Sequence, residues 1–181
     1  HLGIYSSPRV WWMFQTMGHE AIAVLDGGLP AWHAQGFPTE KIKAETYPVG
    51  DFEVDFNSDA VKDFSFVQNH IEQQKTLLID ARSEGRFKGS SPEPREGLRS
   101  GHIPNSINIP YAEVLEHGHL KSKEQLQDLF QQKGIQQEDL VFSCGSGVTA
   151  CIVLLAANRV MENRMAVYDG SWTEWASLSP I

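Results

Sequence analysis

The segment from residue 140 to residue 158 constrains the fold most strongly, because two apolar runs meet there across a loop that contains two glycines. Leu140–Ser143 has the length and composition of a buried strand, and Val148–Asn158 has those of a helix. Cys144 opens the loop between them, which reads Cys-Gly-Ser-Gly. A cysteine at such a junction faces a helix N-terminus and the backbone N–H groups of a tight loop, and both stabilise an anion. We therefore expect Cys144 to be a thiolate nucleophile.

The two cysteines of the chain receive opposite interpretations. Many cysteines that end a core strand are inert packing residues. A packing residue does not need the bare, glycine-rich loop that follows Cys144. Cys151 lies inside the apolar helix instead, so we expect it to belong to the core.

The overall composition restricts the class of protein. The 181 residues suffice for one domain with a full core and part of a second. A net charge of −8 argues against a nucleic-acid-binding surface, and no apolar run has the length of a membrane span. Two cysteines outside any C-x-x-C pair suit a reducing compartment. We expect a cytoplasmic protein with no nucleic-acid or membrane partner, no metal and no cofactor.

Strands and helices alternate along most of the chain, which indicates an α/β fold with a parallel central sheet and helices on both faces. The predicted strands are residues 76–80, 106–109, 140–143 and 165–168. The predicted helices are 58–73, capped by Ser58; 122–133, capped by Ser122 and closed by Gly134; 148–158; and a short final helix. Residues 85–105 are expected to form a polar loop. Functional loops of such sheets gather at the carboxyl ends of the strands, where Cys144 and Asp80 lie.

A repeated sequence indicates how the chain divides into domains. Residues 23–32 and 166–175 share the pattern A-V-x-D-G-x-x-x-x-W, which predicts a strand, an Asp-Gly turn and a short helix in each copy. The same offset places the counterpart of Cys144 at His1, so the first copy lacks the nucleophile, and a helix over 8–17 follows it. We assign residues 1–37 to the end of an inactive first domain, 38–56 to a linker and 57–181 to a catalytic domain.

Several polar residues are candidates to serve the cysteine. The long loop holds five cations, which together suit an anionic substrate because guanidinium groups bind carboxylates bidentately: Arg82, Arg86, Lys88, Arg95 and Arg99. Asp80 and Arg82 are expected to pair and to brace the base of the loop. The hydroxyl of Ser146 is placed to donate to the sulfur or to the substrate. For the other candidates we favour a structural role, either as a hydrogen-bonded loop residue or by packing: His102, Trp172 and Trp175.

These motifs resemble the 3-mercaptopyruvate sulfurtransferases of the rhodanese superfamily over essentially the whole chain. The active loop Cys144-Gly145-Ser146-Gly147-Val148-Thr149 carries the most specific likeness. Further matching segments are Asp80-Ala81-Arg82, Gly85-Arg86-Phe87, Glu93-Pro94-Arg95, Gly101-His102-Ile103-Pro104, Asn108-Ile109-Pro110 and Tyr168-Asp169-Gly170-Ser171-Trp172. In the first part, Ser7-Pro8-Arg9 to Trp12 and Asp26-Gly27-Gly28 look like the end of the family's inactive first domain.

The resemblance implies two tandem rhodanese-like domains with the active site at their interface. It implies that Cys144 accepts a sulfur atom as a persulfide, with Ser146 as its catalytic neighbour, and passes the sulfur to thioredoxin, glutathione, another thiol or cyanide. By motif, Arg86 and Arg95 bind the substrate carboxylate. The remaining loop residues complete the substrate site: Gly145, Gly147, Val148 and Thr149.

The resemblance also separates the alternatives. Thiosulfate-using rhodaneses carry a Cys-Arg-Lys-Gly loop, whereas Gly145 and Ser146 stand here, which favours 3-mercaptopyruvate over thiosulfate. A non-catalytic rhodanese-like binding module is the next alternative, and the presence of Cys144 counts against it. A cysteine phosphatase would need an arginine where Ala150 stands. The family's first-domain aspartate and histidine have no identified counterpart, so we expect this chain by itself to be poorly active.

Overall fold

The computed structural model describes residues 3–41, 46–73 and 76–179. His1, the expected counterpart of Cys144, lies outside the described residues. No helix in the described part of the chain is both long enough and apolar enough to cross a membrane.

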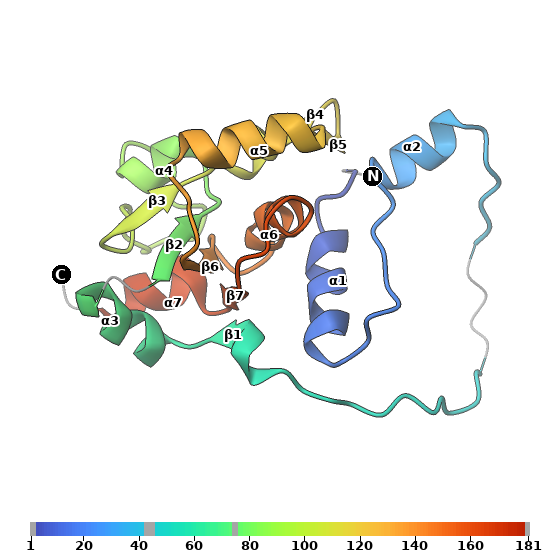
Figure 1. Cartoon of the computed structure of the whole chain (residues 1–181), viewed down its shortest axis with the longest axis horizontal. Coiled ribbons are helices and arrows are strands. Elements are labelled where there is room, and N and C mark those ends of the chain that lie inside the picture. The colour runs from blue at the N-terminus through green and yellow to red at the C-terminus, as the bar shows by residue number, and fades with distance from the viewer. Residues whose placement is uncertain (1–2, 42–45, 74–75, 180–181) are drawn as a thin grey trace.

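A five-stranded parallel sheet forms the centre of the molecule (Figure 1), with the strand order β1-β7-β6-β2-β3. Its strands are β1 Val61–Lys62, β2 Thr76–Asp80, β3 Ser106–Asn108, β6 Asp139–Ser143 and β7 Met165–Tyr168. β6 lies between β2 and β7, so Cys144 follows the central strand. The carboxyl ends of β2 and β6 are in register, with Asp80 opposite Ser143.

Alternation along the strands supplies two hydrophobic cores, one on each face of the sheet. Ile79, Phe142 and Val167 belong to one core, and their neighbours Leu78 and Val141 belong to the other. Successive strand residues point to opposite faces, so strands that are apolar at consecutive positions must be covered on both sides. The predicted α/β class with helices on both faces is confirmed.

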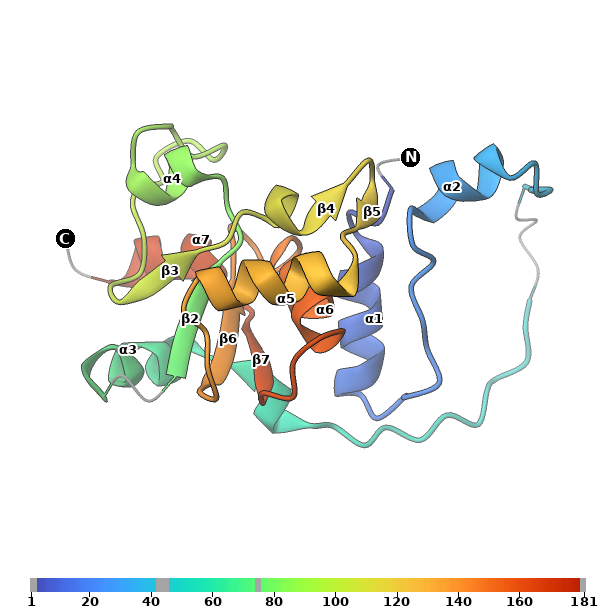
Figure 2. The same cartoon turned by 45° about the horizontal axis from the view of Figure 1, so that its top comes forward.

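The helices divide between these two faces (Figure 2). The first core contains residues of α1, α5 and α6, and the second contains residues of α3 and α7. The helices are α1 Ser7–Thr16, α2 Gly28–Ala34, α3 Phe64–Gln73, α4 Glu84–Lys88, α5 Lys123–Gln132, α6 Ala150–Asn158 and α7 Ser171–Leu178. Shorter elements are the 3-10 turns Ser58–Ala60 and Tyr111–Val114 and the hairpin β4 Leu115–Glu116 with β5 His119–Leu120.

The N-terminal segment contributes to the first core through α1. Trp11 and Trp12 are buried in the same cluster as the residues of α6. In contrast, α2 lies away from the sheet, and the chain that follows it returns to β1 without forming a helix or strand over residues 37–41 and 46–57 (Figure 1). These stretches include all the described residues of the expected linker, 38–41 and 46–56.

Three local predictions from the sequence are wrong. Ser58 does not cap a long helix: it begins a 3-10 turn, Val61–Lys62 pairs with β7, and α3 starts only at Phe64. Residues 23–25 form no strand, because no neighbouring strand pairs with them within the described chain. The loop expected over 85–105 contains most of α4. The prediction for Ser122 is confirmed, since it forms a capping box with Gln125.

Candidate active site

Cys144 is fixed at the end of β6 by the first turn of α7. Its side chain and backbone are buried, with 2% of the residue exposed. Its N–H donates to Ser171 Oγ at 3.2 Å, and its carbonyl accepts from the Trp172 N–H at 2.9 Å. Ser171 itself donates to the carbonyl of Tyr168 at 2.9 Å and has a φ of 52°. Two elements that are distant in sequence, β6 and α7, therefore determine the position of Cys144.

The loop after Cys144 presents unpaired backbone N–H groups. Within the described residues, no protein acceptor is found for the N–H groups of residues 145–149. The loop ends in a turn in which the N–H of Cys151 donates to the carbonyl of Val148, and α6 begins at Ala150. Unpaired N–H groups at the start of a helix favour a negative charge. The loop can therefore stabilise an anion at the sulfur.

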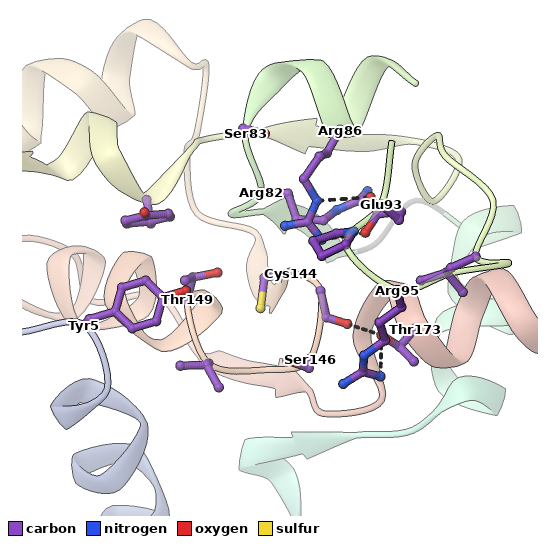
Figure 3. A pocket seen from close by; sticks show the side chains of 15 residues that line it. Tyr5, Arg82, Ser83, Arg86, Glu93, Arg95, Cys144, Ser146, Thr149 and Thr173 are labelled. Carbon is purple, nitrogen blue, oxygen red and sulfur yellow. Dashed lines mark hydrogen bonds and ion pairs between the residues drawn. The ribbon is translucent and has the colours of Figure 1, made fainter. Parts of the chain in front are cut away.

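A cavity of about 400 Å³ lies over the sulfur and this loop (Figure 3). In this view Tyr5 and Thr149 lie on one side of Cys144, and Arg86, Glu93 and Arg95 lie on the other. The lining residues are Tyr5, Arg82, Ser83, Arg86, Glu93, Pro94, Arg95, Leu98, Tyr111, Cys144, Gly145, Ser146, Val148, Thr149 and Thr173.

Arg82 is the buried centre of an ionic network at the base of the cavity. Its guanidinium binds both carboxylate oxygens of Asp80, with Nη2 to Oδ2 at 2.6 Å, and Nη1 donates to Glu93 Oε1 at 2.8 Å. It also lies 4.5 Å from the ring centroid of Trp172 and donates to the carbonyl of Gly101. All its polar edges are used inside the protein. The bracing role expected of Asp80 and Arg82 is confirmed.

Arg86 is directed at the loop by the same network. Its Nη2 donates to Glu93 Oε2 at 2.5 Å and its Nε donates to Glu93 Oε1 at 3.2 Å. That pair occupies the Nε–Nη2 edge of the guanidinium, and no described residue accepts from Nη1. A planar guanidinium held along one edge can offer its remaining N–H groups to a carboxylate in the cavity.

Arg95 is connected to the loop through Thr173. Arg95 Nη1 lies 3.1 Å from Thr173 Oγ1, which donates to the carbonyl of Gly145 at 2.6 Å. The Thr173 N–H donates to the same carbonyl at 3.2 Å. No carboxylate in the described chain pairs with Arg95, so its charge remains uncompensated within the cavity.

The structure brings most of the predicted site residues together. Seven of the eight line the cavity: Cys144, Gly145, Ser146, Val148, Thr149, Arg86 and Arg95. Ser146 is exposed, and its hydroxyl has no protein partner in the described part of the chain. Gly147 is buried and does not line the cavity. It lies next to Arg9 and Asp169, and its φ of 76° suits glycine.

Several residues of the cavity wall were not predicted from the sequence, among them Tyr5, Tyr111 and Glu93. Tyr5 and Tyr111 come from separate segments and meet edge to face, with ring centroids 5.7 Å apart. Partial burial, together with Tyr111 and Cys144 nearby, raises the pKa of the Tyr5 phenol. Glu93 was noted only within a motif, although it orients both Arg82 and Arg86. No periodicity in the sequence indicates that residue 5 reaches a loop at residue 144.

Two structural interpretations are confirmed. Cys151 is fully buried, its Sγ donates to the carbonyl of Gly147 at 3.2 Å, and burial raises the pKa of its thiol to about 12. His102 stacks on Phe87 at a centroid distance of 4.2 Å, and its Nδ1 lies 2.9 Å from the Phe87 carbonyl oxygen. Among the described residues, no cluster of three or more His, Cys, Asp or Glu could hold a metal ion.

Three features define the class of protein to which this chain belongs. They are the cysteine at the end of the central strand, the loop of N–H groups without partners among the described residues, and the parallel sheet covered on both faces. The chain belongs to the rhodanese-like domain family, whose sequence pattern matches residues 64–178. It is 42% identical to the human 3-mercaptopyruvate sulfurtransferase over 175 residues, covering 96% of this chain and 59% of that protein.

Two further comparisons extend this result. The chain is 39% identical to the rat thiosulfate sulfurtransferase over 182 residues, covering 99% of this chain and 61% of that protein. The crystal structure of SseA from Escherichia coli, described as a 3-mercaptopyruvate sulfotransferase with the rhodanese fold, superimposes with a TM-score of 0.81. Its sequence identity is 36%, and the match covers 94% of this chain and 64% of SseA. The chain thus spans about three fifths of these relatives.

Proposed function

We propose that this chain carries the sulfur-transferring site of a 3-mercaptopyruvate sulfurtransferase. The observation that carries the proposal is the position of Cys144 in a cavity that also holds Arg86 and Arg95, above a loop of unpaired N–H groups. One part of the cavity suits a reactive sulfur and the other suits a carboxylate.

The chemistry requires an activated thiolate and a stabilised product. The Cys144 thiolate attacks the sulfur of 3-mercaptopyruvate, the C–S bond breaks, and pyruvate leaves as an enolate that takes up a proton. The new S–S bond makes Cys144 a persulfide, whose outer sulfur loses its proton and accepts hydrogen bonds from the loop N–H groups. An acceptor thiolate then attacks that outer sulfur and releases the Cys144 thiolate. With cyanide as acceptor, the product is thiocyanate.

The charges around the cavity favour a substrate with a single carboxylate. Asp80, Glu93, Arg82 and Arg86 form a network of two negative and two positive groups, which together carry no net charge. Arg95 adds one positive charge. A monoanionic mercapto acid can pair its carboxylate with Arg95 and brings one negative charge fewer towards the Cys144 thiolate than the dianion thiosulfate does.

The remaining loop residues take roles that follow from their positions. Ser146 lines the cavity two residues after the nucleophile, and its hydroxyl, which has no partner among the described residues, can donate to the reacting sulfur or to the substrate carbonyl. Gly145, Val148 and Thr149 contribute backbone N–H groups. Gly147 allows the sharp turn that closes the loop.

We assign residues 57–181 to the catalytic domain, 38–56 to a linker and 1–37 to the end of a preceding inactive rhodanese-like domain. The repeat and the matched range 64–178 support this division. We further propose a reducing compartment such as the cytoplasm, because Cys144 and Cys151 are both free thiols. The physiological acceptor would be a small thiol or a thioredoxin-like protein, which can reach the open cavity.

A thiosulfate sulfurtransferase is the second candidate, and the 39% identity to the rat enzyme of that name favours it. One assay separates the two. Purified protein is given either 3-mercaptopyruvate or thiosulfate without any acceptor, so that a persulfide accumulates, and intact-mass spectrometry reports the addition of one sulfur atom. We expect a persulfide on Cys144 with 3-mercaptopyruvate, no persulfide in Cys144→Ser, and an unchanged result in Cys151→Ser. Pyruvate release that survives in Cys144→Ser would exclude this function.

A further inference from the structure

Arg9, which lies on α1 outside the matched family range, reaches the far side of the reactive loop. Its Nη1 pairs with Asp169 Oδ1 at 2.5 Å and lies 3.5 Å from the carbonyl oxygen of Gly147. The guanidinium carbon lies 4.6 Å from the ring centroid of Trp12, which is itself buried. The side chain is therefore held on two sides, by the ring of Trp12 and by the carboxylate of Asp169.

The contact is tight because residue 147 has no side chain. A Cβ built on Gly147 would lie 2.8 Å from Arg9 Nη1 and 2.9 Å from Asp169 Oδ1. The φ of 76° at this position disfavours any other residue as well. The backbone of the loop thus lies directly against the Arg9–Asp169 ion pair.

Two donors hold the Gly147 carbonyl in one orientation. The guanidinium of Arg9 approaches it at 3.5 Å and the Cys151 thiol donates to it at 3.2 Å. In a planar trans peptide, the carbonyl of one residue and the N–H of the next point in opposite directions. A Gly147 carbonyl held on the side of Arg9 therefore turns the Val148 N–H to the opposite side. Val148 lines the cavity, and no described residue accepts from that N–H.

We propose that Arg9 is a positioning residue for sulfur transfer: it fixes the Gly147–Val148 peptide so that the Val148 N–H stays available to the anionic sulfur on Cys144. This rests on the proposed function for its kinetic consequence. The N-terminal segment thereby acts on the chemistry of the loop as well as on the core. Arg9 does not line the cavity, so it affects the transition state through the backbone and not through the substrate.

The test compares Arg9→Met, Arg9→Lys and Asp169→Asn with Arg164→Met in the full 181-residue chain. Arg164 also pairs with an aspartate, Asp139, but its side chain is 87% exposed. Two readouts are measured. The first is kcat and KM for sulfur transfer from 3-mercaptopyruvate, and the second is the rate of Cys144 alkylation by iodoacetamide as a function of pH.

For Arg9→Met we expect kcat to fall about tenfold with little change in KM, since deleting a donor outright costs a hundredfold or more. The pH at which alkylation reaches half its maximal rate should rise, because the anion is less well stabilised. Arg9→Lys should recover part of both effects, Asp169→Asn should show a smaller loss in the same direction, and Arg164→Met should match the unmodified protein.

Unchanged kcat and an unchanged alkylation profile in folded Arg9→Met would overturn the proposal. A rise in KM at constant kcat would also overturn it, since that result assigns Arg9 to substrate binding. If Arg9→Met does not fold, the same criteria are applied to Arg9→Lys and Asp169→Asn. Alkylation needs no sulfur donor. A protein that transfers no sulfur but shows the expected alkylation shift would refute the proposed function and leave the role of Arg9 in place.

Discussion

The Nη2 atom of Arg86 lies only 2.9 Å from the position that a Cβ on Gly145 would occupy. The residue after Cys144 thus has no side chain at the place where the Arg86 guanidinium, which lines the cavity, approaches the loop. Glu93 holds that guanidinium from behind. The distance between the reacting sulfur and the charge that would bind the carboxylate therefore depends on glycine at position 145.

Gly145→Ala should displace Arg86 without unfolding the protein, because the clashing atom is the end of a flexible side chain. We expect KM for 3-mercaptopyruvate to rise about tenfold, or roughly 1.4 kcal/mol of binding free energy, with kcat less affected. Steady-state kinetics with thermal melting check this result. Gly50→Ala is the control, since nothing lies within 4 Å of its Cβ position. A lower kcat at unchanged KM would contradict this role of Gly145.

Glu93→Gln should destabilise the fold strongly. Glu93 balances Arg82, whose side chain is fully buried, and also binds Arg86. Removing one partner of a buried ionic network leaves uncompensated charge, and we expect the free energy of unfolding to fall by about 3 kcal/mol. Urea denaturation measures the change. Glu84→Gln breaks an exposed pair with Lys88 and should leave stability unchanged. Equal stability of the two variants would contradict this account.

The two cysteines should differ in reactivity. Burial raises the pKa of Cys151 to about 12, so its thiol stays protonated in the folded protein near neutral pH. Iodoacetamide at pH 8 should label Cys144 and leave Cys151 unlabelled until the protein is unfolded, as peptide mass mapping would report. Labelling of Cys151 in the native protein at a comparable rate would show that the burial is incomplete.

The raised pKa of Cys151 also predicts how the free energy of unfolding depends on pH. The folded protein keeps the Cys151 proton up to about pH 12, whereas the unfolded chain releases it near its ordinary value of 9.0. The contribution of the protonated Cys151 thiol to stability is therefore fully present below about pH 9 and is lost as pH rises towards 12. The free energy of unfolding should fall less steeply over this range in Cys151→Ala than in the unmodified chain. If the free energy of unfolding of the two proteins changes with pH in parallel, the raised pKa of Cys151 is contradicted.

Trp11→Ala should reveal that the N-terminal segment is part of the main core. Trp11 is 7% exposed and belongs to the cluster that contains the residues of α6. Truncating a buried aromatic side chain costs about 3–5 kcal/mol, and we expect a loss of that size in chemical denaturation. Trp32→Ala, on the exposed helix α2, is the matched control and should cost much less. A small loss for Trp11→Ala would indicate that α1 packs only weakly.

Patterns of nearby residues were sufficient to predict the structure wherever that structure depends on one segment of the chain. The Ser122–Gln125 capping box, the strand before Cys144 and the burial of Cys151 all follow from nearby residues. The wrong predictions concern elements whose structure depends on segments that are distant in the sequence. Residues 23–25 match the sequence of a strand, but a strand forms only with a hydrogen-bonding neighbour, and the described chain provides none there.

The sequence by itself determined the class of fold and where in it Cys144 lies, because a strand–Cys–glycine loop–helix junction and an alternation of strands and helices are patterns of neighbouring residues. Only the tertiary structure decided what surrounds Cys144. Glu93 orients Arg86, Tyr5 forms part of the wall, and Arg9 holds the Gly147 carbonyl. The contact between Arg9 and Gly147 joins residues 138 positions apart, and such pairs meet only through packing and electrostatic complementarity in the folded chain.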